Sequence, residues 1–354
     1  MKGWRLSPAL AALGGLLVVA SAAVAVPASA ASLARENATI AKTEASAGTA
    51  PAGQPAKRWI VHNPKAYAAA VKSKDWAYTP DGLVYKACVY HIPAGAIVDH
   101  GVIIRRNGTR TAMSCAHPTL AYPATNSPRT VVPSRGVTPA AANCPASNTN
   151  WWAESCAAAP TWLDYLWERF SVPSNPTTSG ALIFFYPSLQ DTAQDTILQP
   201  VLTWGANSIT GVSNPNIWYI TNWYVWGNSY AITNNVHVAP GDTIDGSIVA
   251  TSCNSGGFNC TWTVESSVEG GSATTPLTVV SGVSFTNVEG GVMEVPDATT
   301  CAQMPPNGHE AYRSLSVDTH DGSWAPSFSV YYPNRQCSVT ETASSSGADI
   351  LWNS

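Results

Sequence analysis

The chain has 354 residues, and 11% of them are charged, against about 25% in an average soluble domain. With 45% hydrophobic residues, 14 Trp, 26 Gly and 26 Pro, the composition is that of a packed protein rich in turns. It excludes a disordered chain and an α-helical bundle. Ser, Thr and Asn supply most of the polar side chains and favour strands and turns, so we expect an all-β protein.

Residues 1–30 have the pattern of a signal peptide. Lys2 and Arg5 precede an apolar run from Leu10 to Val26, and the small residues before position 31 form a cleavage site. We expect cleavage after Ala30 and secretion. No later stretch of about 18 apolar residues occurs, so we expect no membrane association after cleavage.

Residues 31–57 are rich in Ala, Thr, Gly and Pro and lack aromatic residues, which indicates a disordered linker or a prosegment. Residues 58–140 contain two strand-like runs and a turn at Asn107-Gly108, typical of a small β module. A stretch rich in Pro, Ala, Ser and Asn, residues 122–150, is the expected boundary to the next domain.

Charge divides the chain at about residue 158. Residues 31–158 hold 13 Lys and Arg against 6 Asp and Glu, whereas residues 159–354 hold 3 against 16. The second half therefore repels nucleic acid and anionic lipid, and we expect neither as a partner. Such a surface suits an acidic medium, although it can also serve solubility alone.

Residues 151–354 contain twelve strand-like runs separated by turn residues. No helical period separates them, so crossover helices and a parallel sheet are excluded. The pattern predicts an acidic domain folded as a large antiparallel β-sandwich or jelly roll.

The cysteines number eight, which in an exported chain indicates disulfides. No CxxC or paired histidine motif suggests zinc, and we expect no metal and no cofactor. Proximity along the chain predicts four local pairs, and the first of them would clip the small β module. The predicted pairs are Cys88–Cys115, Cys144–Cys156, Cys253–Cys260 and Cys301–Cys337.

Several motifs follow one another in the order found in a known family. The segments are the Trp151-Trp152 start, RFSVPSNP at 169–176, IFFYPSL at 183–189, TILQPVLTWG at 196–205, NWYVWG at 222–227, HVAPGDTIDGSI at 237–248 and VEGGVMEVPD at 288–297. Their order resembles that of the eqolisins, or glutamic peptidases, over about 200 residues. The resemblance implies a concanavalin A-like β-sandwich formed by two large bent sheets.

The resemblance also implies a catalytic pair. The strand that carries the catalytic glutamine corresponds to the run containing Gln199, and the glutamate strand corresponds to residues 288–297. This chain departs from the family there, since Pro200 follows Gln199 and no Ala-Glu-Trp motif is present. We assign the glutamate role to Glu294, with Glu289 as the alternative.

A Glu–Gln pair has the chemistry that peptide hydrolysis in acid requires. A carboxylate removes a proton from water, and the neutral amide of Gln donates to the oxyanion without a proton equilibrium of its own. Because an unperturbed Glu titrates near pH 4.3, we predict an acid-active endopeptidase, a monomer acting on polypeptides. The basic N-terminal part would act as a prosegment held on the acidic domain at neutral pH.

The rival interpretation rests on the aromatic residues. Trp204, Trp218, Tyr224 and Trp226 are our candidates for substrate binding. Alternation places Trp218 and Trp226 on one face of a strand and Trp223 on the other, so one set fills the core and the other can line a groove. A lectin-like protein, or a glycan-cleaving enzyme that pairs Glu294 with Glu289 or Glu265, would bind a polysaccharide there.

Overall fold

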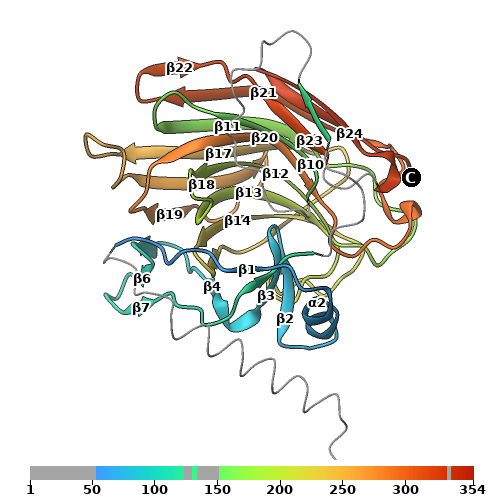
Figure 1. Ribbon diagram of the computed structural model, residues 1–354, viewed down its shortest axis with the longest axis horizontal. Coiled ribbons are helices and arrows are strands. Elements are labelled where there is room, and N and C mark those ends of the chain that lie inside the picture. The colour runs from blue at the N-terminus through green and yellow to red at the C-terminus, as the bar shows by residue number, and fades with distance from the viewer. Residues whose placement is uncertain (1–52, 123–129, 134–150, 333–335) are drawn as a thin grey trace, which may run out of the picture. The chain divides into compact units, whose positions relative to one another are not determined.

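The computed structural model describes residues 53–122, 130–133, 151–332 and 336–354, and Thr49–Ser354 form one compact unit. Two large sheets and one small sheet make up the described part of this unit (Figure 1). We call them sheet I, sheet II and sheet III.

Sheet I contains the strands that carry the candidate catalytic residues. Its strands are β4 (Val89–His91), β9 (Thr130–Pro133), β10 (Trp151–Ala158), β12 (Ile183–Asp191), β13 (Thr196–Trp204), β14 (Trp218–Trp226), β15 (Ser229–Ile232), β16 (Val236–Val238), β20 (Phe285–Glu294) and β23 (Ser329–Tyr332). They lie in the order β4-β15-β14-β13-β12-β20-β10-β23-β9, and β16 pairs with β14.

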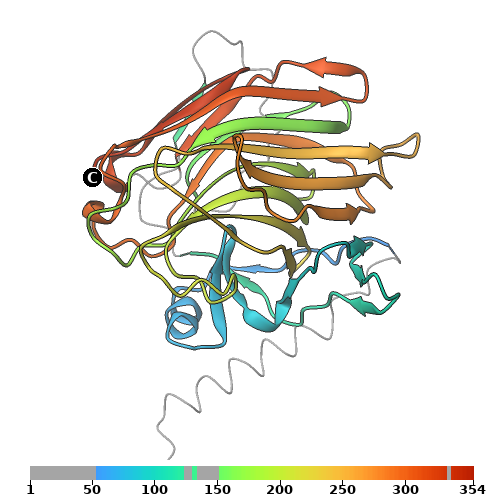
Figure 2. The same ribbon diagram turned by 180° about the vertical axis from the view of Figure 1, so that it is seen from behind.

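Sheet II faces sheet I across the core. Its strands are β5 (Ile97–Asp99), β6 (Val102–Ile104), β7 (Arg110–Ala112), β11 (Leu163–Ser171), β17 (Thr243–Ser252), β18 (Thr261–Val268), β19 (Leu277–Val280), β21 (His309–Thr319), β22 (Gly322–Trp324), β24 (Thr340–Ser344) and β25 (Gly347–Leu351). They lie in the order β24-β25-β21-β11-β17-β18-β19-β5-β6-β7, and β22 pairs with β21. Figure 2 shows the long strands of both sheets from behind.

Sheet III is small and comes from the N-terminal part of the chain. Its strands are β1 (Ile60–Val61), β2 (Trp76–Thr79), β3 (Gly82–Tyr85) and β8 (Thr119–Leu120), in the order β1-β8-β3-β2. The helix α2 (Pro64–Val71) lies between β1 and β2 in the chain. Asn63 starts this helix, because its side-chain oxygen accepts hydrogen bonds from the N–H groups of Lys65 and Ala66. The short 3₁₀ turns are Lys86–Cys88, Cys301–Gln303 and Gln336–Ser338.

The core lies between sheets I and II. Alternate residues of each long strand are buried there and pack against the opposite sheet. Examples are Leu189, Leu198 and Tyr224 from sheet I and Leu166, Ile248 and Trp262 from sheet II, all 0% exposed. Burying one such side chain stabilises the fold by about 1.5–3 kcal/mol. The predicted all-β sandwich is confirmed.

The N-terminal segment is joined to both large sheets. Within residues 58–122, β4 pairs in parallel with β15 of sheet I, and β5 pairs in parallel with β19 of sheet II. We predicted a separate β module over residues 58–140. In the structure, strands of this segment extend both large sheets, and they add parallel strand pairs to sheets that are otherwise antiparallel. Most of the boundary predicted at residues 122–150 lies outside the described residues.

Three of the four predicted disulfides are confirmed. They are Cys88–Cys115, Cys253–Cys260 and Cys301–Cys337. Cys156 is also disulfide-bonded, and its predicted partner Cys144 lies outside the described residues. Disulfides are typical of proteins that fold in an oxidising compartment. Within the described parts of the chain, no helix has the length and apolar character needed to cross a membrane.

Candidate active site

Sheet I has one face against sheet II and a second face, which we call the outer face. On β13, Leu198 and Trp204 pack into the core, whereas Ile197 and Val201 belong to a separate apolar cluster on the outer face. Gln199 lies midway between Ile197 and Val201. Because strand side chains alternate, Gln199 also points to the outer face.

Three polar side chains form a row across the outer face. The register between β12 and β13 is the same on both sides of Ser188, which places Ser188 opposite Gln199. On its other side Ser188 pairs with Glu289 of β20, and its hydroxyl donates a hydrogen bond to Glu289 Oε2. All three residues are 0% exposed. Since adjacent strands are about 4.8 Å apart, the backbones of Gln199 and Glu289 lie about 10 Å apart. We call these residues the polar row.

Glu294 lies outside this row. It pairs with Phe184 of β12, four residues from Ser188. At about 3.3 Å per residue this is about 13 Å along the strand, so the backbone of Glu294 is about 16 Å from that of Gln199. A single peptide carbonyl cannot contact both side chains at that separation. The structure therefore brings Gln199 together with the alternative carboxyl, Glu289, and the spacing disfavours the catalytic role predicted for Glu294.

The surroundings of Glu294 are those of a structural residue. Its Oε2 lies 3.4 Å from the hydroxyl of Tyr186, which also donates to the carbonyl of Pro80 at 2.9 Å. Burial raises the pKa of Glu294 well above its usual range, while hydrogen bonds with Tyr122 and Tyr186 and the charge of Arg58 oppose that rise. Tyr122, Pro80 and Arg58 belong to the N-terminal segment, so Glu294 helps to hold that segment on sheet I.

Glu289 has a different environment, next to a second carboxyl. One oxygen of Glu154, one oxygen of Glu289 and the sulfur of Cys156 lie within 4.8 Å of one another. Burial, followed by the charge of Glu154, raises the pKa of Glu289 well above its usual range, and the hydrogen bond from Ser188 acts in the opposite direction. Because Cys156 is disulfide-bonded, it cannot offer a thiolate, and only two of these three groups could contact a metal ion.

Two irregularities shape the sheet at the polar row. By the same register Pro187 lies opposite Pro200, and since neither has an N–H group, the hydrogen-bond ladder is interrupted there. A bulge at Gly290 shifts the register between β10 and β20 directly after Glu289. Bulges re-aim side chains and occur often beside active sites. An added Cβ at Gly290 would lie 2.6 Å from Phe328 Cζ, so the ring of Phe328 would have to move to admit a side chain there.

Several polar atoms at the row have no protein partner. Four of them have no hydrogen-bond partner among the described residues: Oε1 and Nε2 of Gln199, Oε1 of Glu289 and Nε1 of Trp223. Trp223 pairs with Gln199 across β13 and β14. A buried polar atom left in this state costs about 1–3 kcal/mol. Such an arrangement is suited to a ligand that supplies the missing acceptor and donor.

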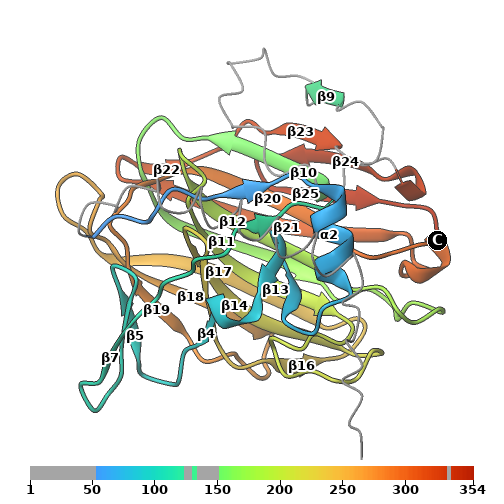
Figure 3. The same cartoon turned by 60° about the horizontal axis from the view of Figure 1, so that its bottom comes forward.

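The β2–β3 hairpin covers the outer face of sheet I. Its residues Ala77 and Val84 are in the same apolar cluster as Val201 and Trp223. Asp81, in the turn between β2 and β3, forms a buried ion pair with Arg58, and the two side chains are 1% and 5% exposed. Figure 3 shows the blue N-terminal segment passing across the strands of sheet I. The three side chains of the polar row are fully buried, so a substrate cannot reach them in this structure.

The aromatic residues predicted to bind substrate lie on the other face. Trp204, Trp218, Tyr224 and Trp226 are in the core between the sheets and are at most 7% exposed. Alternation correctly separated Trp218 and Trp226 from Trp223, and Trp223 is the one on the outer face. Their burial disfavours the predicted contact with substrate. The exposed large hydrophobic residues of the described chain are Val71, Phe258 and Leu351.

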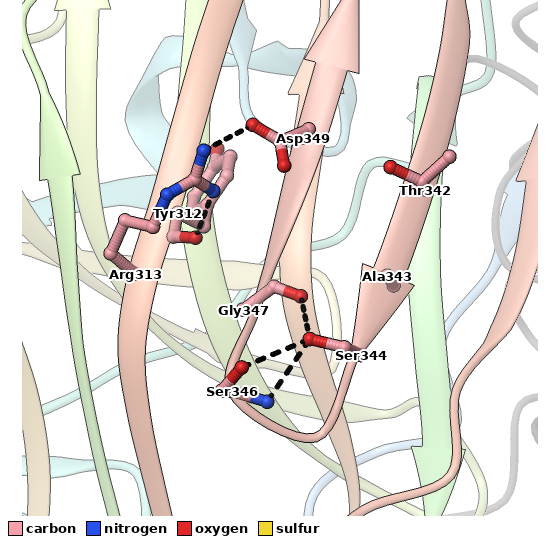
Figure 4. Close-up of a pocket in the computed structure, with 8 residues that line it drawn as sticks. All are labelled: Tyr312, Arg313, Thr342, Ala343, Ser344, Ser346, Gly347 and Asp349. Atoms are coloured by element: carbon pink, nitrogen blue, oxygen red, sulfur yellow. Dashed lines mark hydrogen bonds and ion pairs between the residues drawn. The ribbon is translucent and has the colours of Figure 1, made fainter.

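A hollow of about 480 Å³ lies on sheet II. It is lined by residues of β21, β24 and β25, and within it the guanidinium of Arg313 donates to Asp349 and to the carbonyl of Tyr312 (Figure 4). Asp349 also lies 2.7 Å from Nε2 of His309. The charges are thus paired with one another, which makes this hollow a weaker candidate than the polar row.

No protein-family model matches this chain, and no curated protein matches it. Among solved structures, scytalido-glutamic peptidase with a peptide-based transition-state analogue is 18% identical over 57% of this chain and 98% of the other, with a TM-score of 0.43. SCP-B, described as an eqolisin-family peptidase in complex with the tripeptide Ala-Ile-His, has the same identity and coverage and a TM-score of 0.41.

A third match is the CBM2 module of the evolved Dit of Lactobacillus casei BL23 phage J-1. It is 11% identical over 48% of this chain and 69% of the other, with a TM-score of 0.20. Similarity at these levels assigns neither a family nor an activity to this chain.

Sequence reasoning missed Ser188 and Glu154. Ser188 follows Pro187 in an apolar run, and nothing in the sequence marks it as a neighbour of Glu289. Glu154 lies two residues before Cys156 in β10, and alternation places both on the same face. The sequence signal that could have identified Glu154 is a single acidic residue in an otherwise apolar strand. Burying an unpaired carboxyl costs free energy, so such a residue indicates a specific interaction.

Proposed function

We propose that this protein is an acid-active peptidase in which Glu289 is the general base and Gln199 donates to the oxyanion. The observation that carries the proposal is the polar row, where a buried carboxyl and an unpartnered amide face the same side of one sheet about 10 Å apart. That backbone separation leaves room for one peptide group and one water molecule between the side chains.

The chemistry follows from the atoms that have no partner. A water molecule held by Glu289 Oε1 loses a proton to that carboxylate as its oxygen attacks the peptide carbonyl carbon. The negative charge then develops on the carbonyl oxygen, to which the Gln199 amide N–H donates. The hydrogen bond from Ser188 fixes Oε2 of Glu289 and leaves Oε1 for water. The Glu289 proton can return to the leaving amine.

The cover makes the chain a latent form in this proposal. While the β2–β3 hairpin lies on the outer face, burial keeps the pKa of Glu289 high and substrate cannot enter. Removing the hairpin would hydrate Glu289, lower its pKa towards the usual range and allow it to act as a base in mildly acidic solution. The N-terminal segment would thus be a prosegment, as the sequence suggested.

We also propose that the protein is exported through the signal peptide at residues 1–30. The three disulfides support an oxidising destination. A secreted acidic peptidase would meet polypeptide substrates outside the cell. Secretion is tested by N-terminal sequencing of the protein recovered from the medium of its native host, with a start at residue 31 or later expected.

Casein digestion across a range of acidic pH tests the activity. The full chain should be inactive until the N-terminal segment is released by acid or limited proteolysis. In the released protein, Glu289→Gln should abolish cleavage, and Gln199→Ala should lower kcat by about 10²–10³, the usual effect of losing one oxyanion donor. Glu294→Gln should retain activity.

The matched control is Glu310→Gln. Glu310 is also a fully buried carboxyl, but it lies on β21 of sheet II and accepts hydrogen bonds from Ser171. This variant should cleave casein like the wild type. Absence of cleavage by the folded, released protein at every acidic pH would overturn the proposal, and loss of activity in Glu294→Gln alone would move the base to that residue.

A further inference from the structure

We infer that hydrolysis of one peptide bond, between Lys86 and Ala87, uncovers the polar row, and that the processed protein keeps residues 87–354. The consequence for activity rests on the proposed function, whereas the cut and its products do not. Water adds across the bond and leaves a carboxylate on Lys86 and an amino group on Ala87. The enzyme that performs this step is a peptidase specific for basic residues.

The strands of the N-terminal segment divide at this bond. Before it lie β1, β2 and β3 of sheet III, together with α2, which packs on that sheet. After it, β4 pairs with β15 of sheet I, and β5 pairs with β19 of sheet II. Strands β6 and β7 continue sheet II from β5. The part before the bond is therefore a cover, and the part after it belongs to the sandwich.

Packing in the core follows the same division. Five side chains after the bond are at most 7% exposed and pack in the core between sheets I and II. They are Ile92, Ala96, Val98, Ile103 and Met113. No described residue between positions 53 and 86 belongs to either core cluster between these sheets. Loss of residues 53–86 thus leaves the core closed, whereas loss of β4–β7 would expose it to water.

Residues 53–86 can leave the outer face without separating their buried ion pair. Their fully buried side chains in the apolar cluster of that face are Ala77 and Val84, which are small. Arg58 and Asp81 both lie before the bond, so the two charges leave together. An ion pair that is divided leaves an uncompensated buried charge, and this cut avoids that cost.

The first disulfide fixes which cuts can free the cover. Cys88 is the first cysteine of the sequence, and it pairs with Cys115. A chain cut between these two residues stays joined by the disulfide. A chain cut before Cys88 has no disulfide to the part that leaves, so the cover can separate.

Lys86 is the basic residue in position for such a cut. Five basic residues of the segment 53–122 precede β2, and a cut after any of them leaves the β2–β3 hairpin attached. Three more lie inside the loop closed by the disulfide. These eight residues are Lys57, Arg58, Lys65, Lys72, Lys74, Arg105, Arg106 and Arg110. Lys86 remains, directly after β3.

The bond also lies where a peptidase can reach the chain. Lys86–Cys88 form a single 3₁₀ turn between β3 and β4, and no side chain caps this turn. Ala87 is exposed and Lys86 is half-buried. Exposed turns are preferred sites of proteolytic cleavage.

Trypsin, which cleaves after basic residues, is the probe for the folded full chain. Mass spectrometry should find a new N-terminus at Ala87. Size-exclusion chromatography in acidic solution should separate the residues before Ala87 from the rest. The remaining protein should unfold cooperatively in urea and bind more of the dye ANS, because the apolar outer face is then exposed.

Two variants make the test specific. Lys86→Gln should keep the cover under trypsin, whereas Lys74→Gln, at an exposed position before the hairpin, should lose it like the wild type. Release of the cover from Lys86→Gln would overturn the inference. An intact Lys86–Ala87 bond in the wild type, a cover that stays bound after the cut, or an unfolded remainder would also overturn it.

A second pair of variants covers the case in which Lys86→Gln does not fold. The recognition sequence of a site-specific peptidase is inserted before Ala87 in one and before Gly108, in the turn between β6 and β7, in the other. Cleavage of the first should free the cover, and cleavage of the second should free nothing, because Cys88–Cys115 joins the pieces. The opposite result in either variant would contradict the inference.

Casein digestion after removal of trypsin separates this inference from the proposed function. Digestion in acid by the protein that begins at Ala87 would support both. A folded protein that has lost the cover and never digests casein would refute the proposed function alone. Digestion that appears only when residues 87–122 have also been lost would overturn the inference and leave the proposed function standing.

Discussion

The carboxyl of Asp191 makes the free energy of unfolding of this protein depend on pH. Its carboxyl is 6% exposed at the end of β12, where it accepts a hydrogen bond from the N–H of Thr196 at 2.9 Å. Burial raises the pKa of Asp191 from 3.8 to about 6, and the charge of Asp195 adds to the rise while backbone hydrogen bonds oppose it. The folded state therefore holds this proton more tightly than the unfolded state does.

The direction of the pH effect follows from this difference. Stabilisation from the Asp191 proton is complete below the unfolded pKa of 3.8 and is lost as the pH rises through the folded pKa of about 6. Each tenfold change in proton affinity corresponds to 1.36 kcal/mol, so the loss is about 3 kcal/mol. Asp191→Asn removes the titration and keeps an oxygen that accepts from Thr196.

Urea unfolding followed by Trp fluorescence, between about pH 3.5 and about pH 7, measures the effect. The unfolding free energy of the wild type should fall relative to Asp191→Asn by about 3 kcal/mol over that range. Asp321→Asn, at an exposed position, is the matched control and should follow the wild type. Parallel pH curves for the wild type and Asp191→Asn would refute the reasoning.

Two further predictions concern the bulge and the cover. Gly290→Ala should lower the unfolding free energy by about 1–3 kcal/mol in a urea titration, because its Cβ would lie 2.6 Å from Phe328 Cζ. A variant as stable as the wild type would show that the bulge does not need glycine. Arg58→Met should loosen the N-terminal segment, since Asp81 would lose its buried ion-pair partner, which typically costs about 3–5 kcal/mol. Limited proteolysis should then cut residues 58–122 faster, and equal rates for both proteins would contradict this.

Other buried carboxyls act in the same direction as Asp191. Burial raises the pKa of Glu168, Glu310 and Glu341 well above the usual range, and each of these residues is at most 3% exposed. Their protons are bound more tightly in the folded state, so their stabilising effect is greatest in acid and declines as the pH rises. The acid tolerance inferred from charge alone thus has a second source in the core.

The strands could be predicted because their signals are local. Runs such as those of β12, β13 and β14 are apolar and rich in aromatic and β-branched residues, and turn residues separate them. The disulfides could be predicted because the paired cysteines are close to each other in the sequence. The helix α2 was missed, because eight residues rich in Ala give little periodicity.

The site required information that the sequence does not contain. Both faces of sheet I are buried, so its central strands lack the polar alternation that would identify the core face. Choosing Glu289 over Glu294 depends on β12 lying between β13 and β20. The proximity of Glu154 depends on a one-residue bulge at Gly290. None of these pairings is local in sequence.

The N-terminal segment also forms most of the edges of the two large sheets. Among the described strands, β4 and β9 end sheet I and β7 ends sheet II, so three of the four sheet borders are formed by residues that precede β10. A border strand with free N–H and C=O groups is a template for pairing with another chain. If processing removed this segment, β15, β19 and β23 would become new borders. A mature form would then have to prevent self-association at these new borders in another way. Alternatively, it would keep the short border strands β4, β7 and β9 after the β2–β3 hairpin was removed.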